Sequence, residues 1–301
     1  MYQKKGIDFM MNIGIIGSES SHAMQFAKYF NLPDPQTGKI RHSNIRVTSI
    51  MGDAESAKKT AEDAHVENIA ETVDELLATV DAVMITSRRG SQHMEQALPF
   101  IKKQVPIFID KPFTSNLPQA QEFAELLHKA ACPVLGGSGC KYCASVHRIK
   151  TTVQKLLVED SLLTASLNFA IMMDSPYDGF YFYAPHLVEI CLEIFGAEIQ
   201  AIQAIRTEKS LVANLQYTNF IVSLHFVTNV WENTCTLLTT SGPQVMTLDI
   251  SDCLTEEAER FAQLLHQEIQ STSYDELVRP IMLIDAILRA ESSGETISFP
   301  L

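Results

Sequence analysis

The sequence has no long hydrophobic run. No stretch reaches the roughly 18 to 20 apolar residues that a membrane-spanning helix needs, and the first residues lack the basic, apolar and small-residue series of a secretory signal. These absences argue against a membrane partner, and we expect a cytoplasmic protein.

Basic residues are scarce relative to acidic ones. The chain has 23 Lys and Arg against 36 Asp and Glu, a formal net charge of -13 at pH 7. Such a charge repels phosphodiester backbones, and no run of Lys and Arg interleaved with aromatic residues offsets it. We therefore expect no nucleic-acid partner.

Cysteine is also sparse, with six residues in a chain too large to need disulfides, so we expect free thiols. Cys140 and Cys143, followed by His147, have a spacing that zinc ligands use. A structural zinc site needs four ligands, and no second pair of matching spacing follows. The sequence predicts no metal site.

The first nine residues are polar and show no periodicity. Because they precede the first apolar run, we expect the native protein to begin at Met10 or Met11. At 301 residues the chain is long enough for two hydrophobic cores.

The first half alternates short apolar runs with segments of helical spacing. Strands are predicted at 12–17, 47–51, 81–86, 106–110 and 133–135, and helices at 20–30, 54–64, 72–79, 93–103 and 117–130. Strict alternation of this kind predicts a Rossmann domain with a doubly wound parallel sheet, which we place at residues 10–135.

The pattern changes after the glycine-rich segment 136–139. We predict a helix at about 143–158, strands near 163–172, 198–207, 211–218, 220–228, 233–240 and 244–250, helices at about 255–270 and 274–291, and a final strand at 297–299. Short connections favour a mostly antiparallel open sheet. Residues 136–301 are therefore predicted to form a second, α+β domain.

Ligands of open parallel sheets collect beyond the carboxyl ends of the strands. The first such loop runs Gly17, Ser18, Glu19, Ser20, Ser21, His22, and it keeps only one glycine of the Rossmann fingerprint. Glu19 stands at the second glycine's place, where a carboxylate is unfavourable beside a diphosphate unless it turns away. The alternative is a plain strand-to-helix turn capped by Ser20 or Ser21. Asp53, after the second strand, is either a ribose 2′-hydroxyl acceptor or a turn residue.

The most specific motif is Asp-Ala-Val-Met-Ile-Thr-Ser at 81–87, followed by His93 and by Asp110-Lys111-Pro112 at the end of a later strand. Over residues 12–140 this resembles the Gfo/Idh/MocA oxidoreductases. The resemblance implies NAD or NADP as cofactor. It also implies cofactor contacts from the 17–22 loop and from the following residues: Asp53, Thr86, Ser87, His93, Asp110 and Pro112.

In that family the lysine of the motif, here Lys111, lies beside the nicotinamide and the substrate. A buried lysine has a lowered pKa that suits proton transfer; the alternative is a surface lysine after a strand. The family's second catalytic segment resembles D-x-G-x-H, and here His186 matches its histidine while Phe182 replaces its aspartate. Tyr183 is predicted as an auxiliary donor. The alternative for His186 is a packed helix histidine.

Lys141 and Tyr142 stand where relatives bind substrate. The resemblance also implies a homodimer or homotetramer through the sheet of the second domain.

The sequence thus predicts an oxidoreductase that transfers a hydride between nicotinamide and a hydroxyl-bearing carbon of a sugar, polyol or related small metabolite. Glu19 and Phe182 motivate an alternative, a non-catalytic sensor on the same scaffold. A third hypothesis is non-redox chemistry that uses a tightly held cofactor.

Overall fold

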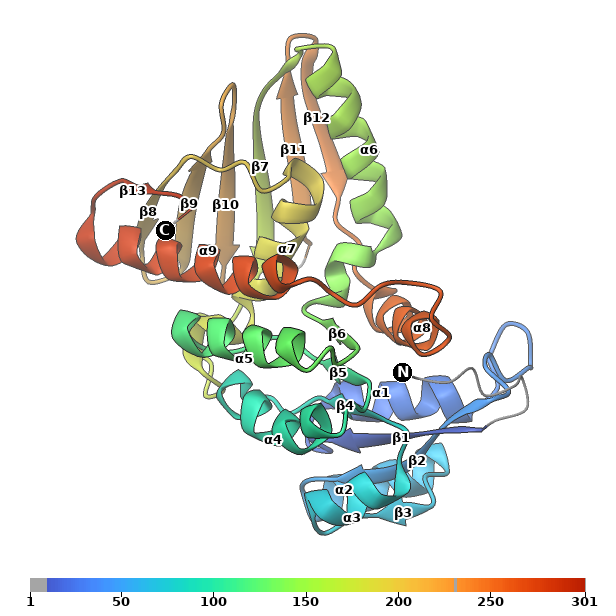
Figure 1. The fold of residues 1–301 in the computed structure, drawn as a ribbon. Coiled ribbons are helices and arrows are strands. Elements are labelled where there is room, and N and C mark those ends of the chain that lie inside the picture. The colour runs from blue at the N-terminus through green and yellow to red at the C-terminus, as the bar shows by residue number, and fades with distance from the viewer. Residues whose placement is uncertain (1–9, 230–231, 301) are drawn as a thin grey trace. The chain divides into compact units, whose positions relative to one another are not determined.

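The computed structural model describes residues 10–229 and 232–300 (Figure 1). The predicted start at Met10 or Met11 concerns residues 1–9, which lie outside the described residues. The chain forms two compact units. The N-terminal unit takes in the chain up to Thr114 together with 121–136 and 254–274, and the C-terminal unit takes in 115–120, 137–253 and 275–301.

A six-stranded parallel sheet organises the N-terminal unit, in the order β3-β2-β1-β4-β5-β6. Its strands are β1 (Met11–Ile16), β2 (Ile45–Met51), β3 (Asn68–Ile69), β4 (Ala82–Ile85), β5 (Ile107–Ile109) and β6 (Val134–Gly136). The central strands are buried over nearly their whole length, as expected for a sheet covered on both faces. The predicted doubly wound Rossmann sheet is confirmed; β3, with two exposed residues, was not predicted.

Local signals start the helices of this unit. They are α1 (Ser21–Asn31), α2 (Ala54–Ala64), α3 (Val73–Thr79), α4 (Gly90–Lys102) and α5 (Leu117–Lys129). Thr72 caps α3 by accepting from the N–H of Glu75 at 3.2 Å. The helix α4 begins three residues before the predicted His93, at a glycine whose added Cβ would lie 2.6 Å from Pro112 Cγ. The start of α4 thus has no side-chain cap and is packed closely against Pro112.

Helix α8 (Cys253–Leu265) contributes to the N-terminal core although it follows the second sheet in sequence. Its buried Phe261, Ala262 and Leu265 join the apolar cluster that contains Phe26 and Phe108. A single boundary between 135 and 136 therefore does not describe the chain, because the apolar face of α8 belongs to the first core.

A seven-stranded mixed sheet organises the C-terminal unit, in the order β12-β11-β7-β10-β9-β8-β13. The strands are β7 (Leu162–Ala170), β8 (Ala201–Arg206), β9 (Ser210–Gln216), β10 (Ile221–Val227), β11 (Thr234–Thr239), β12 (Gly242–Thr247) and β13 (Ile297–Ser298). Only β7 and β10 pair in parallel, with Ser166 opposite Ser223. The predicted mostly antiparallel sheet is confirmed.

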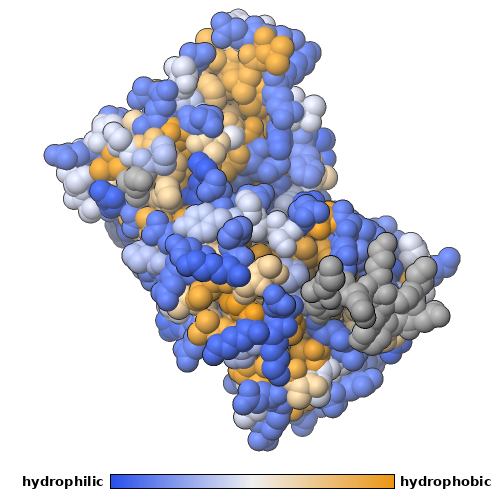
Figure 2. Space-filling view, in the orientation of Figure 1, coloured by the Kyte–Doolittle hydropathy of each residue, from blue (hydrophilic) through white to orange (hydrophobic). Residues whose placement is uncertain are grey.

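One face of this sheet packs against helices α6 (Ala144–Val158), α7 (Ala184–Phe195) and α9 (Tyr274–Ser293) in a single core. The other face is formed by every second residue of the strands, such as 164, 166, 168 and 170 in β7 and 221, 223, 225 and 227 in β10. These positions contain no Asp, Glu, Lys or Arg, and they are half-buried or exposed. Figure 2 shows apolar surface on this unit. The last two residues of α6, Leu157 and Val158, are exposed apolar residues. None of the helices in the described part of the chain has the length and apolar character needed to cross a membrane.

Candidate active site

In the N-terminal unit, the loop that follows β1 lies against the loop that follows β4. Gly17 has a φ of +100°, and a Cβ added there would lie 2.3 Å from the backbone nitrogen of Ser87. The hydroxyl of Thr86 donates to the carbonyl oxygens of Ile16 at 3.0 Å and Gly17 at 3.1 Å. Only glycine permits this φ at so close an approach, so the one fingerprint glycine that remains is required by packing between two predicted cofactor loops.

The β1 loop also rests on the end of β2. The N–H groups of Gly17 and Ser18 both donate to the carbonyl oxygen of Met51, at 2.9 and 3.2 Å. The Ser18 hydroxyl donates to the main-chain oxygen of Asp53 at 2.9 Å. The Asp53 carboxylate accepts from the N–H of Ser56 at 2.9 Å, which lowers the pKa of Asp53. Asp53, predicted to bind a ribose, therefore caps α2 in this structure.

The Glu19 side chain, which stands at the second glycine's place, lies close to Gly52 of another loop. Gly52 has a φ of +147°, and a Cβ added there would lie 3.2 Å from Glu19 Oε2. Ser20 caps α1 by accepting from the N–H of His22 at 3.3 Å, and Ser21 is the first residue of that helix. The N–H of Ala23 also has an acceptor, the carbonyl oxygen of Ser20 at 3.2 Å. Part of the first turn, where an anion could bind a helix, is therefore already satisfied within the protein.

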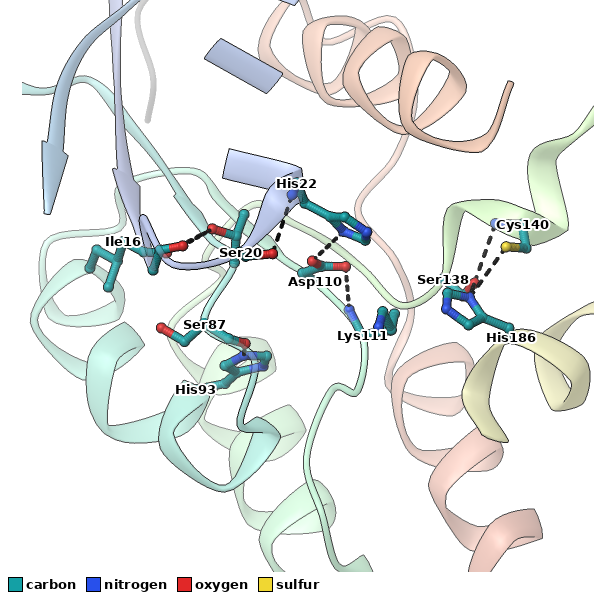
Figure 3. Close-up of polar contacts among 12 residues, drawn as sticks. Ile16, Ser20, His22, Ser87, His93, Asp110, Lys111, Ser138, Cys140 and His186 are labelled. Atoms are coloured by element: carbon teal, nitrogen blue, oxygen red, sulfur yellow. Dashed lines mark hydrogen bonds and ion pairs between the residues drawn. The ribbon is translucent and has the colours of Figure 1, made fainter. Parts of the chain in front are cut away.

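His22 and Asp110 form an ion pair at the end of β5. The two atoms, Nδ1 and Oδ2, are 2.6 Å apart, and the Asp110 side chain is only 3% exposed (Figure 3). Burial raises the pKa of Asp110, but the opposing charges of His22 and Lys111 outweigh it and the pKa is lowered. Glu257 of α8 brings a third ligand atom within 4.8 Å of the other two.

Lys111 follows directly and is 6% exposed. Its N–H donates to Asp110 Oδ1 at 2.7 Å, and its peptide bond to Pro112 is cis. His93, fully buried on α4, contacts the carbonyl oxygen of Ser87 through Nε2 at 2.7 Å. Burial lowers the pKa of His93. The predicted residues of the β4 and β5 loops are thus brought together at one edge of the sheet.

In the C-terminal unit, His186 lies on the first turn of α7 and faces the turn η1 (Gly139–Tyr142). Its Nδ1 is 2.7 Å from Ser138 Oγ and 3.2 Å from Cys140 Sγ (Figure 3). Ser138 is completely buried, and its Oγ also accepts from the N–H of Cys140 at 3.3 Å. Two side chains of this segment, Ser138 and Cys140, therefore contact Nδ1 of His186.

Glu189, one turn after His186, fixes the same turn. Its carboxylate accepts from the N–H of Ser138 at 2.9 Å and from Lys141 Nζ at 2.7 Å. Burial lowers the pKa of Lys141, but Glu189 outweighs it and the pKa is raised. A Cβ on Gly137 would lie 2.4 Å from Glu189 Oε2. Lys141, predicted to bind substrate, is in a buried ion pair, and the Tyr142 ring lies 5.1 Å from its Nζ.

Tyr183 precedes α7 as its N-cap residue. Its ring centroid is 6.3 Å from that of His186 and 4.8 Å from that of Phe182. The aromatic ring of Phe182 thus packs beside Tyr183, where the family pattern has an aspartate. Among the described residues, Cys140, Cys143 and His147 do not come close enough to share an ion.

Sequence reasoning missed Ser138, Glu189 and Glu257. The spacing of Glu189 from His186, three residues along one helix, is a signal that could have found it. Glu257 carried no such signal, because it lies far along the chain from Asp110.

Comparison with known proteins supports the N-terminal assignment. A family model described as "Oxidoreductase family, NAD-binding Rossmann fold" (GFO_IDH_MocA) matches residues 11–138. The resemblance to the Gfo/Idh/MocA oxidoreductases is confirmed over these residues, and the predicted cofactor, NAD or NADP, agrees with that description. No curated protein sequence matches the chain.

Solved structures resemble nearly the whole chain. GenD2 from gentamicin A biosynthesis, in complex with NAD, is 13% identical over 99% of this chain and 98% of that one, with a TM-score of 0.82. Myo-inositol dehydrogenase from Lactobacillus casei, with NAD(H) and myo-inositol, is 14% identical over 97% and 98%, at 0.78. The WlbA dehydrogenase from Bordetella pertussis, with NADH and UDP-GlcNAcA, is 14% identical over 97% and 99%, also at 0.78. At these identities the likeness establishes the fold.

Proposed function

We propose that this chain, whose residues 11–138 match an NAD-binding oxidoreductase family, transfers a hydride between a nicotinamide cofactor and a hydroxyl-bearing carbon of a sugar, polyol or related small metabolite. The observation that carries this proposal is the buried Lys111 at the end of β5, held to Asp110 and adjoining the His22–Asp110 pair. The myo-inositol and UDP-GlcNAcA complexes of structural neighbours support the substrate class.

The residues of the N-terminal unit suit a nicotinamide dinucleotide. Glu19 is turned over Gly52, so its carboxylate need not stand in the path of a diphosphate. Ser18, Ser20 and Ser21 lie in the loop that leads into α1, and the start of this helix is where a Rossmann unit holds the diphosphate. When bound, the nicotinamide accepts or supplies the hydride.

The chain's own residues would handle the proton. We propose that the Lys111 ammonium bonds the reacting oxygen and that His186 exchanges the hydroxyl proton, with Tyr183 as an auxiliary donor. The Ser138 hydroxyl contacts Nδ1 of His186 at 2.7 Å and would help to orient the ring for this exchange. Phe182 removes the charge of the family's aspartate, and in this chain a neutral serine hydroxyl bonds the imidazole instead.

Phe182 also favours one other function, a ligand sensor without turnover. Its ring packs against Tyr177 at 5.3 Å and Tyr183 at 4.8 Å, an aromatic cluster where the family has an acid-base group. A sensor would bind a small molecule and need no proton relay.

The deciding experiment joins cofactor titration with turnover. We expect saturable binding of a reduced nicotinamide cofactor, monitored by its fluorescence. With the oxidised cofactor as hydride acceptor, we expect oxidation of at least one member of a sugar and polyol panel. Lys111→Ala should lower turnover by roughly 10² to 10⁴, the usual worth of a general acid or base, while the exposed Lys102→Ala keeps it. Binding without turnover on the panel would favour the sensor.

We further propose a homodimer or homotetramer built through the uncharged face of the C-terminal sheet, and a cytoplasmic location. The free state of all six cysteines supports a reducing compartment.

A further inference from the structure

The end of β2 is the place where a Rossmann unit distinguishes the two nicotinamide cofactors. An acidic group there bonds the adenosine ribose 2′-hydroxyl of NAD, and NADP carries a phosphate at that position. In this chain β2 ends at Met51 and is followed by Gly52 and Asp53. The residue that meets a ribose at this point would therefore set the choice of cofactor.

Asp53 is already engaged in the fold. Its carboxylate accepts from the N–H of Ser56 at 2.9 Å as the N-cap of α2, and its main-chain oxygen accepts from Ser18 Oγ at 2.9 Å. One carboxylate oxygen of Asp53 and its main-chain oxygen are thus engaged within the fold, and the cap fixes the side chain against α2. Asp53 also adds negative charge to the end of β2.

Glu19 reaches the same place from the other loop. The N–H groups of Gly17 and Ser18 fasten the β1 loop to the carbonyl oxygen of Met51. The next residue, Glu19, lays its carboxylate over Gly52, where an added Cβ would lie 3.2 Å from Oε2. Glu19 is only partly buried, so its second oxygen can accept from a ligand.

The turn after β2 carries acidic side chains only. Residues 52–57, which form this turn and the first turn of α2, contain Asp53 and Glu55 and no Lys or Arg. A ribose 2′-phosphate placed here would meet the Glu19 and Asp53 carboxylates without an opposing cation in that turn. Like charges brought together in this way repel each other.

We infer that Glu19 is the residue that makes this protein prefer NAD over NADP, by accepting from the ribose 2′-hydroxyl and repelling a 2′-phosphate. The inference rests on the proposed function, because it concerns the same cofactor site. It gives a role to the carboxylate that replaces the second fingerprint glycine, and it assigns the selection to the β1 loop and not to the acid after β2.

The test compares dissociation constants of NADH and NADPH, followed by nicotinamide fluorescence, for the wild-type protein, Glu19→Gln and Asp53→Asn. Asn keeps the helix cap, so Asp53→Asn is a matched control that removes one carboxylate from the same strand end. We expect wild-type protein to bind NADH at least about tenfold tighter than NADPH. Glu19→Gln should reduce that ratio about tenfold, chiefly by tighter NADPH binding, and Asp53→Asn should change it by less than about twofold.

Three results would overturn the inference while leaving the proposed function intact: equal binding of both cofactors by wild type, a ratio that moves only in Asp53→Asn, or equal tightening of both cofactors in Glu19→Gln. The last result would mean that Glu19 repels the diphosphate. Failure of wild type to bind either cofactor would overturn the proposed function as well. Glu19→Ser, which shortens the side chain, should repeat the result of Glu19→Gln.

Discussion

The Ser138 hydroxyl oxygen lies 2.7 Å from His186 Nδ1, and both residues are held by neighbours that leave them little freedom. The N–H of Cys140 also donates to Ser138 Oγ, which helps to fix the position of the hydroxyl. We expect this contact to orient the imidazole and to bias which of its nitrogens carries the proton.

Removing the Ser138 hydroxyl should therefore change the environment of the His186 imidazole. We expect Ser138→Ala to lower turnover about tenfold, a fraction of what a general acid or base contributes, with NADH affinity unchanged. Nitrogen chemical shifts of His186, measured by NMR at several pH values, should report a changed tautomer. Cys140→Ala, which removes the longer 3.2 Å contact, serves as the comparison. An unchanged His186 spectrum in Ser138→Ala would contradict the role.

The ion pair of Lys141 and Glu189 makes a prediction about stability. Both side chains are nearly buried, at 11% and 5% exposure. Glu189→Gln would leave a buried ammonium without its counter-charge, which costs about 3 to 5 kcal/mol in the free energy of unfolding. Urea denaturation should show this loss. The double variant Lys141→Met, Glu189→Gln should recover part of it, and a double variant as unstable as Glu189→Gln alone would show that the pair is not coupled.

Acid sensitivity should arise in part from His93. Burial lowers its pKa in the folded protein from the ordinary 6.5. As the pH falls below about 6.5, the unfolded chain binds a proton that the folded protein does not, so the free energy of unfolding decreases until the lowered pKa is reached. His93→Gln keeps a hydrogen-bond donor for the Ser87 carbonyl oxygen, but glutamine binds no proton in this pH range. The variant should lose less stability than wild type between about pH 8 and pH 5.5, measured by urea titration at both values. Equal losses would exclude His93 as a contributor.

The uncharged face of the C-terminal sheet should hold the oligomer together. A glutamate at Ile221, 46% exposed at the start of β10, would bring charge onto that face at the end of the sheet's central strand. We expect Ile221→Glu to lower the mass measured by light scattering to that of the monomer. Val158→Glu, at an 89% exposed position where α6 ends, should leave the mass unchanged. A monomeric wild-type protein would refute the proposal.

Local sequence patterns predicted most elements because their causes are local. The helix at 54–64 was predicted with its observed bounds, since Asp53 caps its start and His65 ends it in the left-handed region. The strand β3 escaped prediction because its two residues are exposed and have no pattern. The direction of the Glu19 side chain could not be predicted either, since it depends on a glycine in another loop.

The place of α8 was the largest miss in the fold. Its apolar stripe predicted a helix correctly, but a stripe does not say which core it enters. For the same reason Glu257 was not predicted as a site residue. Its carboxylate comes within 4.8 Å of His22 and Asp110 only because α8 packs into the first core. Contacts between distant segments are properties of the whole chain, and no window of sequence contains them.

That placement of α8 also bears on how the protein is made. A chain emerging from the ribosome would have all six strands of the parallel sheet after residue 136, yet Phe261 and its neighbours would still be unsynthesised. Until α8 arrives, the faces of Phe26 and Phe108 that it covers stay open to water or to a chaperone. Synthesis thus begins with the N-terminal unit, but that unit is complete only after α8 has been made. A stop codon anywhere before residue 254 would leave it without this helix.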